Sequence, residues 1–253
     1  MNEEKKENDI DITKTCLPTE KTIPSKKIEG YHWLIYGQQK IGKSTFCSQF
    51  ENPLFLPTEA GLKSLSIFKM PTNRDLITNW PEFIMICREI KKSIDSNTFK
   101  FNTIVIDTVD NLYQLCLEYV CKKHEMKHPS DQDFGKGWWL VMQEFKSVIN
   151  KVLSWGPGVI FTSHEELKEK KTKKECINKI SPSLSGAAGK YILSTVDIIA
   201  YIGFSESDER IIKTRGTDYL DAGDRTGYLD PEMPVDYKKV VEIFNKKGAN
   251  KNV

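Results

Sequence analysis

One stretch decides the fold: Gly37-Gln-Gln-Lys-Ile-Gly42-Lys43-Ser44, which matches the pattern G-x-x-x-x-G-K-[ST] at every defined position. The apolar run 31–36 precedes it and indicates a short strand, and a helix is expected from about Lys43 to Phe50. Glycine lets the backbone curl so that successive N–H groups face one anion, and the helix N-terminus adds partial positive charge. The stretch therefore predicts a phosphate-binding loop rather than an ordinary glycine turn before a helix.

The side chains of this loop have separate predicted roles. Lys43 is expected to reach the β- and γ-phosphates of a nucleotide, and Ser44 to offer its hydroxyl to Mg²⁺. Thr45 would support the phosphate end of the nucleotide. The expected cofactors are therefore ATP and Mg²⁺, held by the consecutive residues Gly37, Gln38, Gln39, Lys40, Ile41, Gly42, Lys43, Ser44 and Thr45.

Apolar runs that indicate buried strands alternate with helical stretches along the rest of the chain. The expected strands are 53–57, 103–107, 158–162, 197–202 and 210–213. The expected helices are 80–96, 109–125, 138–154, 186–195 and 235–247. This alternation predicts an α/β fold with a mainly parallel central sheet flanked by helices and a C-terminal β-hairpin. The expected organisation is a flexible polar arm at 1–28, one domain at 29–248 and a tail at 249–253.

Composition limits the function classes. The 253 residues carry 37 basic and 35 acidic side chains, a formal net charge of +2, so overall charge favours neither nucleic acid nor membrane binding. No apolar run approaches the ~18 residues needed to cross a bilayer. The N-terminus lacks the apolar core of a secretory signal. We therefore expect a cytoplasmic protein with no membrane partner, in which any binding of nucleic acid is a local property.

Polar side chains follow three of the expected strands, and the carboxyl ends of parallel strands meet at one edge of a sheet. Asp107 ends one strand and is expected to hold Mg²⁺ through a water, although a helix N-cap would also suit it. Glu59 follows the strand 53–57 and is the candidate for orienting an attacking water. Ser163 or His164 would sense the γ-phosphate. The alternatives are a solvated glutamate and a histidine satisfied at a strand end.

The order of these features is similar to that of RecA-like ATPases. The phosphate loop comes first, then Thr58-Glu59, then a strand ending in Asp107, and then a strand ending in Ser163-His164. More narrowly, the chain resembles compact phage-encoded members of that superfamily, which act in recombination as single-strand annealing factors. The resemblance covers about residues 28–235, and the phosphate loop is its one strongly specific motif. It implies slow, DNA-stimulated ATP hydrolysis in recombination or annealing.

The resemblance also implies a homo-oligomer with the nucleotide between subunits. In RecA-like enzymes a neighbouring subunit inserts a basic side chain toward the γ-phosphate. The matching segment here is 210–215, where Lys213 or Arg215 would complete the site in trans. Such a side chain can raise the rate by ~10³-fold or more through charge stabilisation of the transition state. A charged hairpin on the surface is the alternative.

Single-stranded DNA is the partner that the resemblance implies, together with a single-strand DNA-binding protein. RecA-like proteins hold the strand with loops that correspond here to about 127–138 and 165–185. The second loop contains a lysine cluster that would neutralise phosphates: Lys168, Lys170, Lys171, Lys173 and Lys174. Trp138, in the first loop, would stack on bases. The alternatives are a solvated lysine loop and a tryptophan that belongs to the core.

A group of metal-binding residue types does not predict a zinc site. Cys116, Cys121, His124 and His128 fall close together in the sequence. On a single helix the last three would share a face, where a four-ligand tetrahedron is hard to close. Zinc fingers instead separate their ligand pairs so that the chain folds back on itself.

Two other functions are compatible with the same loop. A small-molecule kinase is one, but such kinases usually carry an arginine-rich lid, and the segment 165–179 holds lysines and no arginine. A DNA-binding module that uses nucleotide as a switch, without essential hydrolysis, is the other. A test of Glu59 separates that module from an ATPase.

Overall fold

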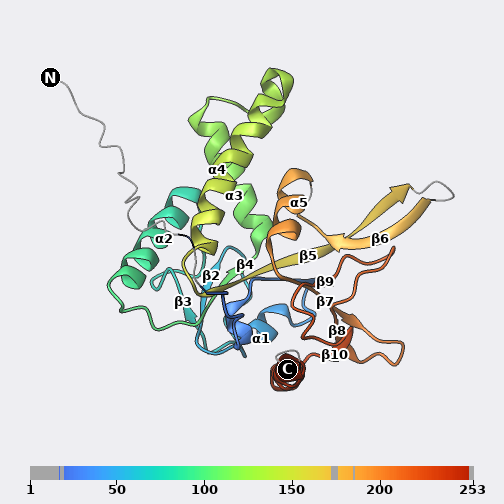
Figure 1. Ribbon diagram of the computed structural model, residues 1–253. Helices are drawn as coiled ribbons and strands as arrows, with labels where there is room; N and C mark the ends of the chain where they lie inside the picture. Colours follow the sequence, from blue (N-terminus) through green and yellow to red (C-terminus); the bar gives the residue numbers. More distant parts are fainter. Residues whose placement is uncertain (1–16, 18–19, 172–175, 185, 251–253) are drawn as a thin grey trace.

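The computed structural model describes residue 17 and residues 20–171, 176–184 and 186–250 (Figure 1). Within them one ten-stranded sheet has the order β10-β8-β7-β1-β5-β4-β2-β3, with β6 paired to β5 and β9 paired to β7. The strands are β1 (Trp33–Gly37), β2 (Pro53–Pro57), β3 (Phe68–Lys69), β4 (Thr103–Asp107), β5 (Gly158–Lys171), β6 (Cys176–Pro182), β7 (Ile198–Phe204), β8 (Arg210–Lys213), β9 (Gly223–Asp224) and β10 (Glu232–Pro234).

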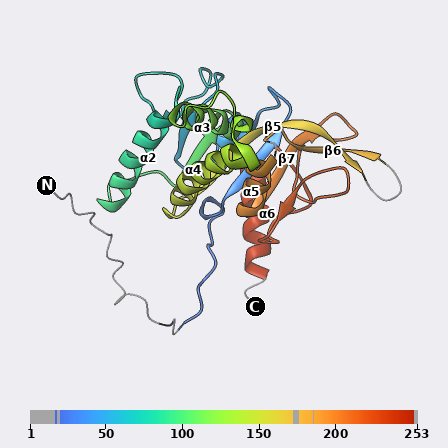
Figure 2. The ribbon, with the colours of Figure 1, turned by 90° about the horizontal axis from the view of Figure 1, so that it is seen from above.

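Helices cover both faces of this sheet (Figures 1 and 2). The helices are α1 (Lys43–Cys47), α2 (Trp80–Asp95), α3 (Val109–Lys123), α4 (Lys136–Leu153), α5 (Gly186–Thr195) and α6 (Tyr237–Asn250), and short 3-10 turns lie at η2 (Ile28–Gly30), η3 (Pro129–Asp131) and η4 (Asp133–Gly135). α2, α3, α4 and α5 pack on one face, while α1 and α6 pack on the other. No described helix combines the length and the apolar composition that spanning a bilayer requires.

The central strands are buried on both sides, which explains their continuous apolar runs. Every residue of β1, β2 and β4 is buried. Along β4, Ile104 and Ile106 belong to the core under α2–α5, whereas Val105 belongs to the core under α1 and α6. β1 pairs in parallel with β5 and β7, and β4 pairs in parallel with β2 and β5. The predicted α/β class with a mainly parallel sheet is therefore confirmed.

The last strands reverse direction, as the sequence predicts. β8 pairs antiparallel with β7, and β10 pairs antiparallel with β8. These strands extend the sheet beyond β7, so the C-terminal hairpin belongs to the same sheet as the phosphate-loop strand β1. α6 then returns beneath the sheet and packs Val240 and Phe244 into the core that it shares with α1.

The segment expected as a lysine-rich loop at 165–179 is instead a β-hairpin. β5 continues past the sheet to Lys171 and pairs antiparallel with β6, from Glu165 opposite Pro182 to Lys171 opposite Cys176. The hairpin projects from the body of the molecule in both ribbon views. Residues 165–171 are charged apart from Leu167, so this part of β5 lacks the alternation of apolar and polar residues that marks a half-buried strand.

One helix end differs from expectation, and one helix start resolves an open choice. α1 ends at Cys47, three residues before the expected Phe50, so it is a single short turn with a small dipole. α3 has Thr108 as its N-cap, whose hydroxyl accepts from the N–H of Asn111 at 3.5 Å. Asp107 is therefore not the helix cap.

Candidate nucleotide-binding site

The phosphate loop joins β1 to α1 at the carboxyl edge of the sheet. Gly42 has φ of 106°, a left-handed conformation that glycine adopts without strain. Gly37 lies so close to β7 that a Cβ atom there would stand 2.2 Å from the carbonyl oxygen of Ile202. Glycine is therefore required at position 42 by the left-handed backbone and at position 37 by the close packing against β7.

Lys43 folds back over the loop that precedes it. Its Nζ donates to the carbonyl oxygens of Gly37 at 3.0 Å and Gln38 at 2.8 Å, and the residue is 6% exposed. Burial lowers the pKa of the Lys43 ammonium, and the carboxylates of Asp107 and Glu59 oppose that shift. Two carbonyl oxygens thus hold the ammonium inside the loop, and phosphate oxygens can take their place as hydrogen-bond acceptors.

Asp107 is fixed by hydroxyl groups on both of its oxygens. Its Oδ2 accepts from the Ser44 hydroxyl at 2.6 Å, and its Oδ1 accepts from the Thr162 hydroxyl. Asp107 is 5% exposed, and Thr162 is fully buried on β5. Thr162 is not among the residues predicted from the sequence, where its one signal is a hydroxyl in the otherwise apolar run 158–162.

The oxygens of Ser44 and Asp107 suit Mg²⁺. Hydroxyl and carboxylate oxygens are the ligands that this hard cation prefers, usually with several waters retained. The two predicted metal-binding side chains are in direct contact, and both line one cleft. Ser44 and Asp107 would hold Mg²⁺ in the cleft that Lys43 also lines, and the ion would neutralise phosphate charge there.

Glu59 and His164 form a pair across the cleft. His164 Nε2 and Glu59 Oε2 are 2.9 Å apart, and His164 Nδ1 lies 3.5 Å from the Nζ of Lys43. The Thr108 hydroxyl also donates to Glu59 Oε2 at 3.5 Å. His164 therefore links the predicted water-orienting carboxylate to the predicted phosphate-binding ammonium.

Ser163 points elsewhere. Its hydroxyl donates to Asp110 Oδ1 at 3.0 Å, and it is absent from the walls of the cleft, which His164 lines. Both residues lie inside β5 rather than at its end, but His164 is level with Gly37, the last residue of β1. The strand passes the edge of the central sheet at this point, which brings His164 to the phosphate loop.

These side chains surround a cleft of about 280 Å³. Its walls come from the phosphate loop, from the segment after β2, from the end of β4 and from β5. The described residues that line it are Gln39, Lys40, Gly42, Lys43, Ser44, Thr45, Glu59, Ala60, Gly61, Leu62, Ser64, Leu65, Asp107, Thr108 and His164. Of the predicted loop residues, Gly37 and Gln38 contribute carbonyls to Lys43, and Ile41 is buried in the core.

Arg210 reaches the phosphate loop of its own chain. Its Nη1 donates to the carbonyl oxygen of Ile41 at 3.2 Å, beside Gly42. The two residues predicted to act in trans lie farther along the same segment. Lys213 faces Glu232 at 3.9 Å and Arg215 is exposed, and neither lines the cleft of its own subunit. The sequence does not distinguish Arg210 from Lys213 and Arg215. Strand register decides which of the three contacts the phosphate loop.

The lysines predicted to bind DNA fall on the β5–β6 hairpin. Lys168 donates to the carbonyl oxygen of Pro182 at 2.6 Å and lies 3.5 Å from Glu166. Lys170 and Lys171 belong to β5 by their backbone, and Lys173 and Lys174 lie outside the described residues. Lys168 is therefore engaged within the protein at the base of the hairpin.

The four metal-binding residue types do not share one helix face. α3 ends at Lys123, with His124 as its C-cap, and His128 lies beyond it at the start of a 3-10 turn. Cys116 and Cys121 are buried in the core. Within the described ranges no three His, Cys, Asp or Glu residues come together as metal ligands would.

Comparisons with known proteins place these features in a family. Residues 29–226 match the family model described as an AAA domain. The SPbeta prophage-derived uncharacterized protein YorG of Bacillus subtilis (strain 168) is 26% identical over 221 residues, which make up 84% of this chain and 65% of that protein. The chain thus spans less than two thirds of the length of that relative.

One solved structure aligns with most of the chain at a low structural score. The KaiC-like protein PH0186 from Pyrococcus horikoshii OT3 aligns with 75% of this chain and 80% of its own, with a TM-score of 0.41 and 12% identity. The family of this chain is therefore given by the AAA domain match over residues 29–226 and not by this structural similarity. That match includes the phosphate loop, Asp107 and His164. The chain belongs to the AAA domain family of P-loop ATPases.

Proposed function

We propose that this protein binds ATP with Mg²⁺, hydrolyses it slowly, and acts on single-stranded DNA in phage recombination or annealing. One observation carries the ATPase part of the proposal. Lys43, Ser44, Asp107, Glu59 and His164 come from four separate segments and meet at one cleft, at the carboxyl edge of a parallel sheet. This arrangement would supply a phosphate site, a metal site and a site for the attacking water.

Each side chain would have one task in hydrolysis. Lys43 exchanges its carbonyl partners for phosphate oxygens, and the loop N–H groups hold the same phosphates. Ser44 and Asp107 hold Mg²⁺, which neutralises charge on the phosphates when bound. Glu59 accepts a proton from the attacking water, and His164 both orients Glu59 and lies next to the γ-phosphate. Because one oxygen of Glu59 is already paired with His164, we expect slow turnover in the absence of DNA.

The DNA part of the proposal rests on the resemblance to phage annealing ATPases and on the hairpin. A prophage-derived relative supports a phage setting, in which the host cytoplasm is the place of action. Since Lys168 already donates to a carbonyl oxygen, the proposed phosphate contacts are the lysines that follow it in the sequence: Lys170, Lys171, Lys173 and Lys174. We further propose a homo-oligomer in which Lys213 or Arg215 enters a neighbour's cleft, and a single-strand DNA-binding protein as partner.

The deciding experiment is the ATPase rate with and without single-stranded DNA, measured for the wild type and for Lys43→Ala. We expect stimulation by DNA and loss of all turnover in the variant. Stimulation that survives in Lys43→Ala would contradict the assignment of the cleft. Intact ATP binding without any stimulation would instead favour a small-molecule kinase or a nucleotide-gated module.

The hairpin is tested separately through the salt dependence of DNA binding. Each phosphate contact to a single strand contributes about 0.7 to the slope of log K against log salt. Replacing these four lysines by glutamine should therefore lower that slope by up to about 3. The matched control replaces four exposed lysines on α2 and α6: Lys91, Lys92, Lys238 and Lys239. An equal loss in the control would remove the hairpin from the proposal.

A further inference from the structure

Thr58 joins the strand β2 to the predicted water-orienting residue Glu59. β2 and β4 pair in parallel as far as Pro57, which lies opposite Asp107. Just beyond that point the backbone N–H groups of Thr58 and Glu59 both donate to the carbonyl oxygen of Asp107, at 2.7 and 3.2 Å. The backbone that carries Glu59 is therefore fastened to the residue that carries the predicted Mg²⁺ ligand.

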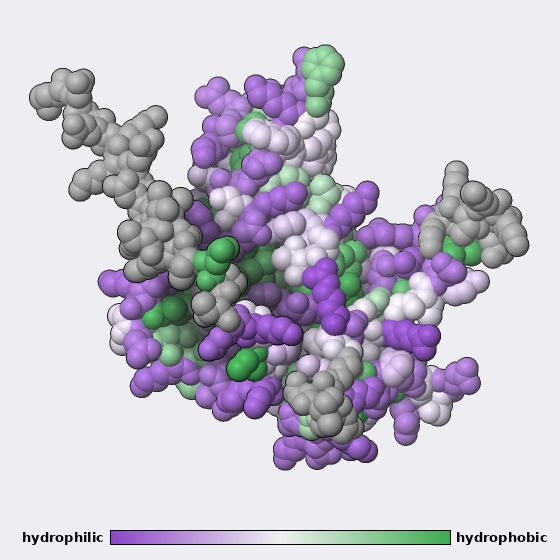
Figure 3. Space-filling view, in the orientation of Figure 1, coloured by the Kyte–Doolittle hydropathy of each residue, from purple (hydrophilic) through white to green (hydrophobic). Residues whose placement is uncertain are grey.

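The Thr58 hydroxyl makes a second connection, one residue farther along. It accepts from the N–H of Thr108 at 2.8 Å and donates to the carbonyl oxygen of Thr108 at 2.7 Å. Hydrophilic residues cover most of the face seen in Figure 3, whereas Thr58 and Thr108 are only 8% and 2% exposed. Water has little access to this hydroxyl, so its hydrogen bonds are those with the backbone of Thr108.

The first turn of α3 holds the same segment through two side chains. The Asn111 amide donates to the carbonyl oxygen of Thr58 at 3.3 Å. The Thr108 hydroxyl donates to Glu59 Oε2 at 3.5 Å. The end of β4 and the start of α3 thus contact both the backbone before Glu59 and its carboxylate.

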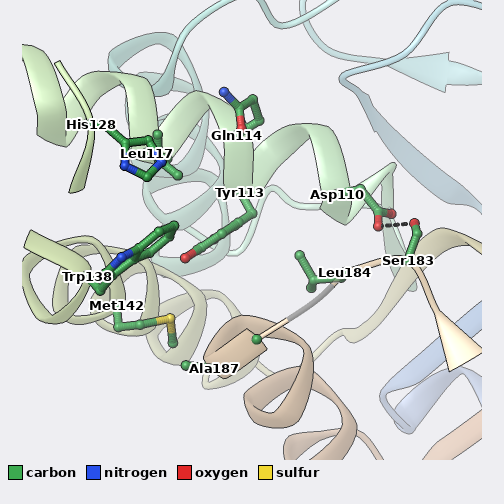
Figure 4. Close-up of a pocket in the computed structure, with 11 residues that line it drawn as sticks. Asp110, Tyr113, Gln114, Leu117, His128, Trp138, Met142, Ser183, Leu184 and Ala187 are labelled. Atoms are coloured by element: carbon green, nitrogen blue, oxygen red, sulfur yellow. Dashed lines mark hydrogen bonds between the residues drawn. The ribbon is translucent and has the colours of Figure 1, made fainter. Parts of the chain in front are cut away.

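His164, which faces Glu59 across the cleft, is held by a separate set of hydrogen bonds. Its carbonyl oxygen accepts from the N–H of Ser183 at 2.8 Å. The Ser183 hydroxyl in turn donates to Asp110 at 2.6 Å, as Figure 4 shows. Neither bond involves Thr58, so a change at Thr58 should displace Glu59 and leave the backbone of His164 in place.

We propose that Thr58 is a positioning residue that acts through Glu59. Its hydroxyl fixes the Glu59 segment to the end of β4, so the water-orienting carboxylate and the Asp107 carboxylate keep one separation. Thr58 is not among the described residues that line the cleft, and it makes no contact with the reacting groups itself. Misplacement of a catalytic group by about 1 Å can cost about 100-fold in rate, which gives such a residue its importance. The inference rests on the proposed ATPase activity.

The first test compares Thr58→Val with Thr103→Val. Both changes replace a buried hydroxyl by a methyl group, but Thr103 Oγ1 has no hydrogen-bond partner among the described residues. We expect Thr58→Val to lower kcat by about 10- to 100-fold and to keep the dissociation constant for ATP within about threefold. Thr103→Val should change neither value, and Thr58→Ser, which keeps the hydroxyl, should restore most of kcat.

Equal kcat values for the two valine variants would overturn the proposal. Action through Glu59 is tested by adding Thr58→Val to Glu59→Gln. If Thr58 acts by placing that carboxylate, the second change should lower kcat by less than about twofold. A full further loss would overturn the proposal, whereas a wild type without turnover would contradict the proposed function instead.

A second measurement needs neither nucleotide nor turnover. An ammonium only donates and a carboxylate only accepts, so an imidazole with its hydrogen on Nε2 suits the place of His164 between Lys43 and Glu59. The Nε2 signal of His164 is followed by NMR in protein labelled at histidine, and is identified by its loss in His164→Gln. We expect Thr58→Val to shift this signal in the same direction as Glu59→Gln. An unshifted signal in Thr58→Val would overturn the proposal, even for a protein that does not hydrolyse ATP.

Asn111→Ala decides the question if Thr58→Val does not fold. Asn111 is exposed on α3, and the variant loses the hydrogen bond to the carbonyl oxygen of Thr58. It should shift the His164 signal in the same direction as Thr58→Val and lower kcat by a smaller factor. The matched control is Gln114→Ala, an exposed position nearly one turn farther along the same helix. Equal results for the two alanine variants would overturn the proposal.

Discussion

Replacing Lys43 by methionine should have opposite effects on nucleotide binding and on the stability of the free protein. Methionine matches the length of the lysine stem and removes the charge. The ammonium is 6% exposed, and its two partners are the loop carbonyls of Gly37 and Gln38. A hydrogen bond to a charged group contributes about 1.5–3 kcal/mol, so losing one such bond to phosphate should weaken ATP binding by about 10- to 150-fold.

Without nucleotide the same change removes a costly buried charge. Replacement of buried charged groups by apolar ones is often neutral or stabilising, so we expect the free energy of unfolding of Lys43→Met to rise by zero to about 1 kcal/mol. For a chain of this size that corresponds to at most about 4 °C in melting temperature. Because burial lowers the pKa of Lys43 in the folded state, the cost exists at neutral pH and disappears as the pH rises through that pKa toward the unfolded value. The advantage of the variant should therefore shrink at alkaline pH.

The assay pairs a fluorescent-nucleotide titration with thermal denaturation in the absence of nucleotide, at pH 7 and pH 10. Lys43→Ala is the control, because it also removes the packing of the stem and should be less stable than Lys43→Met. A change in ATP affinity below about threefold would refute the role of Lys43. A fall of more than about 5 °C in the melting temperature of Lys43→Met would refute the view that its charge is costly.

Three further changes test the cleft. In Asp107→Asn the anionic oxygen beside Ser44 is lost, so ATP affinity in nucleotide titrations should be the same within about twofold with and without Mg²⁺. An affinity that still depends on Mg²⁺ would place the ion elsewhere. In steady-state and binding assays, Glu59→Gln should lower kcat about 100-fold or more and keep the dissociation constant for ATP within about threefold. Unchanged turnover would exclude Glu59 as the general base. Arg210→Ala should raise KM for ATP by about 5- to 10-fold with kcat nearly unchanged, because the carbonyl of Ile41 loses its donor. Arg210→Lys should recover part of this loss, and a fall in kcat alone would contradict a positioning role.

The sequence allowed much of the cleft to be predicted because parallel strands end at the same edge of a sheet. Lys43 and Ser44 follow one strand, Glu59 follows the next, and Asp107 ends a third, so their proximity follows from topology. His164 was predicted from the same rule, although β5 does not end there. Hydrophobic periodicity and position at a strand end were sufficient to predict these residues, because each lies in or directly after a recognisable strand.

Features set by contacts between distant segments could not be predicted in this way. Arg210 meets Ile41 because β8 lies two strands away from β1 in the sheet, an adjacency that no local pattern records. Thr162 looks like one more strand residue until β4 is placed beside β5. The hairpin was missed for a different reason, since residues 165–171 are charged apart from Leu167 and show no apolar periodicity.

The length of β5 has a mechanical consequence. The same unbroken strand carries His164 beside the phosphate loop and continues through seven more residues to Lys171 at the outer part of the hairpin, a span of about 23 Å at 3.3 Å per residue. There is no hinge along that path, because the residues from Glu165 to Lys171 are paired with β6 throughout. A displacement of the outer part of the hairpin would therefore reach the backbone of His164 along one continuous paired strand.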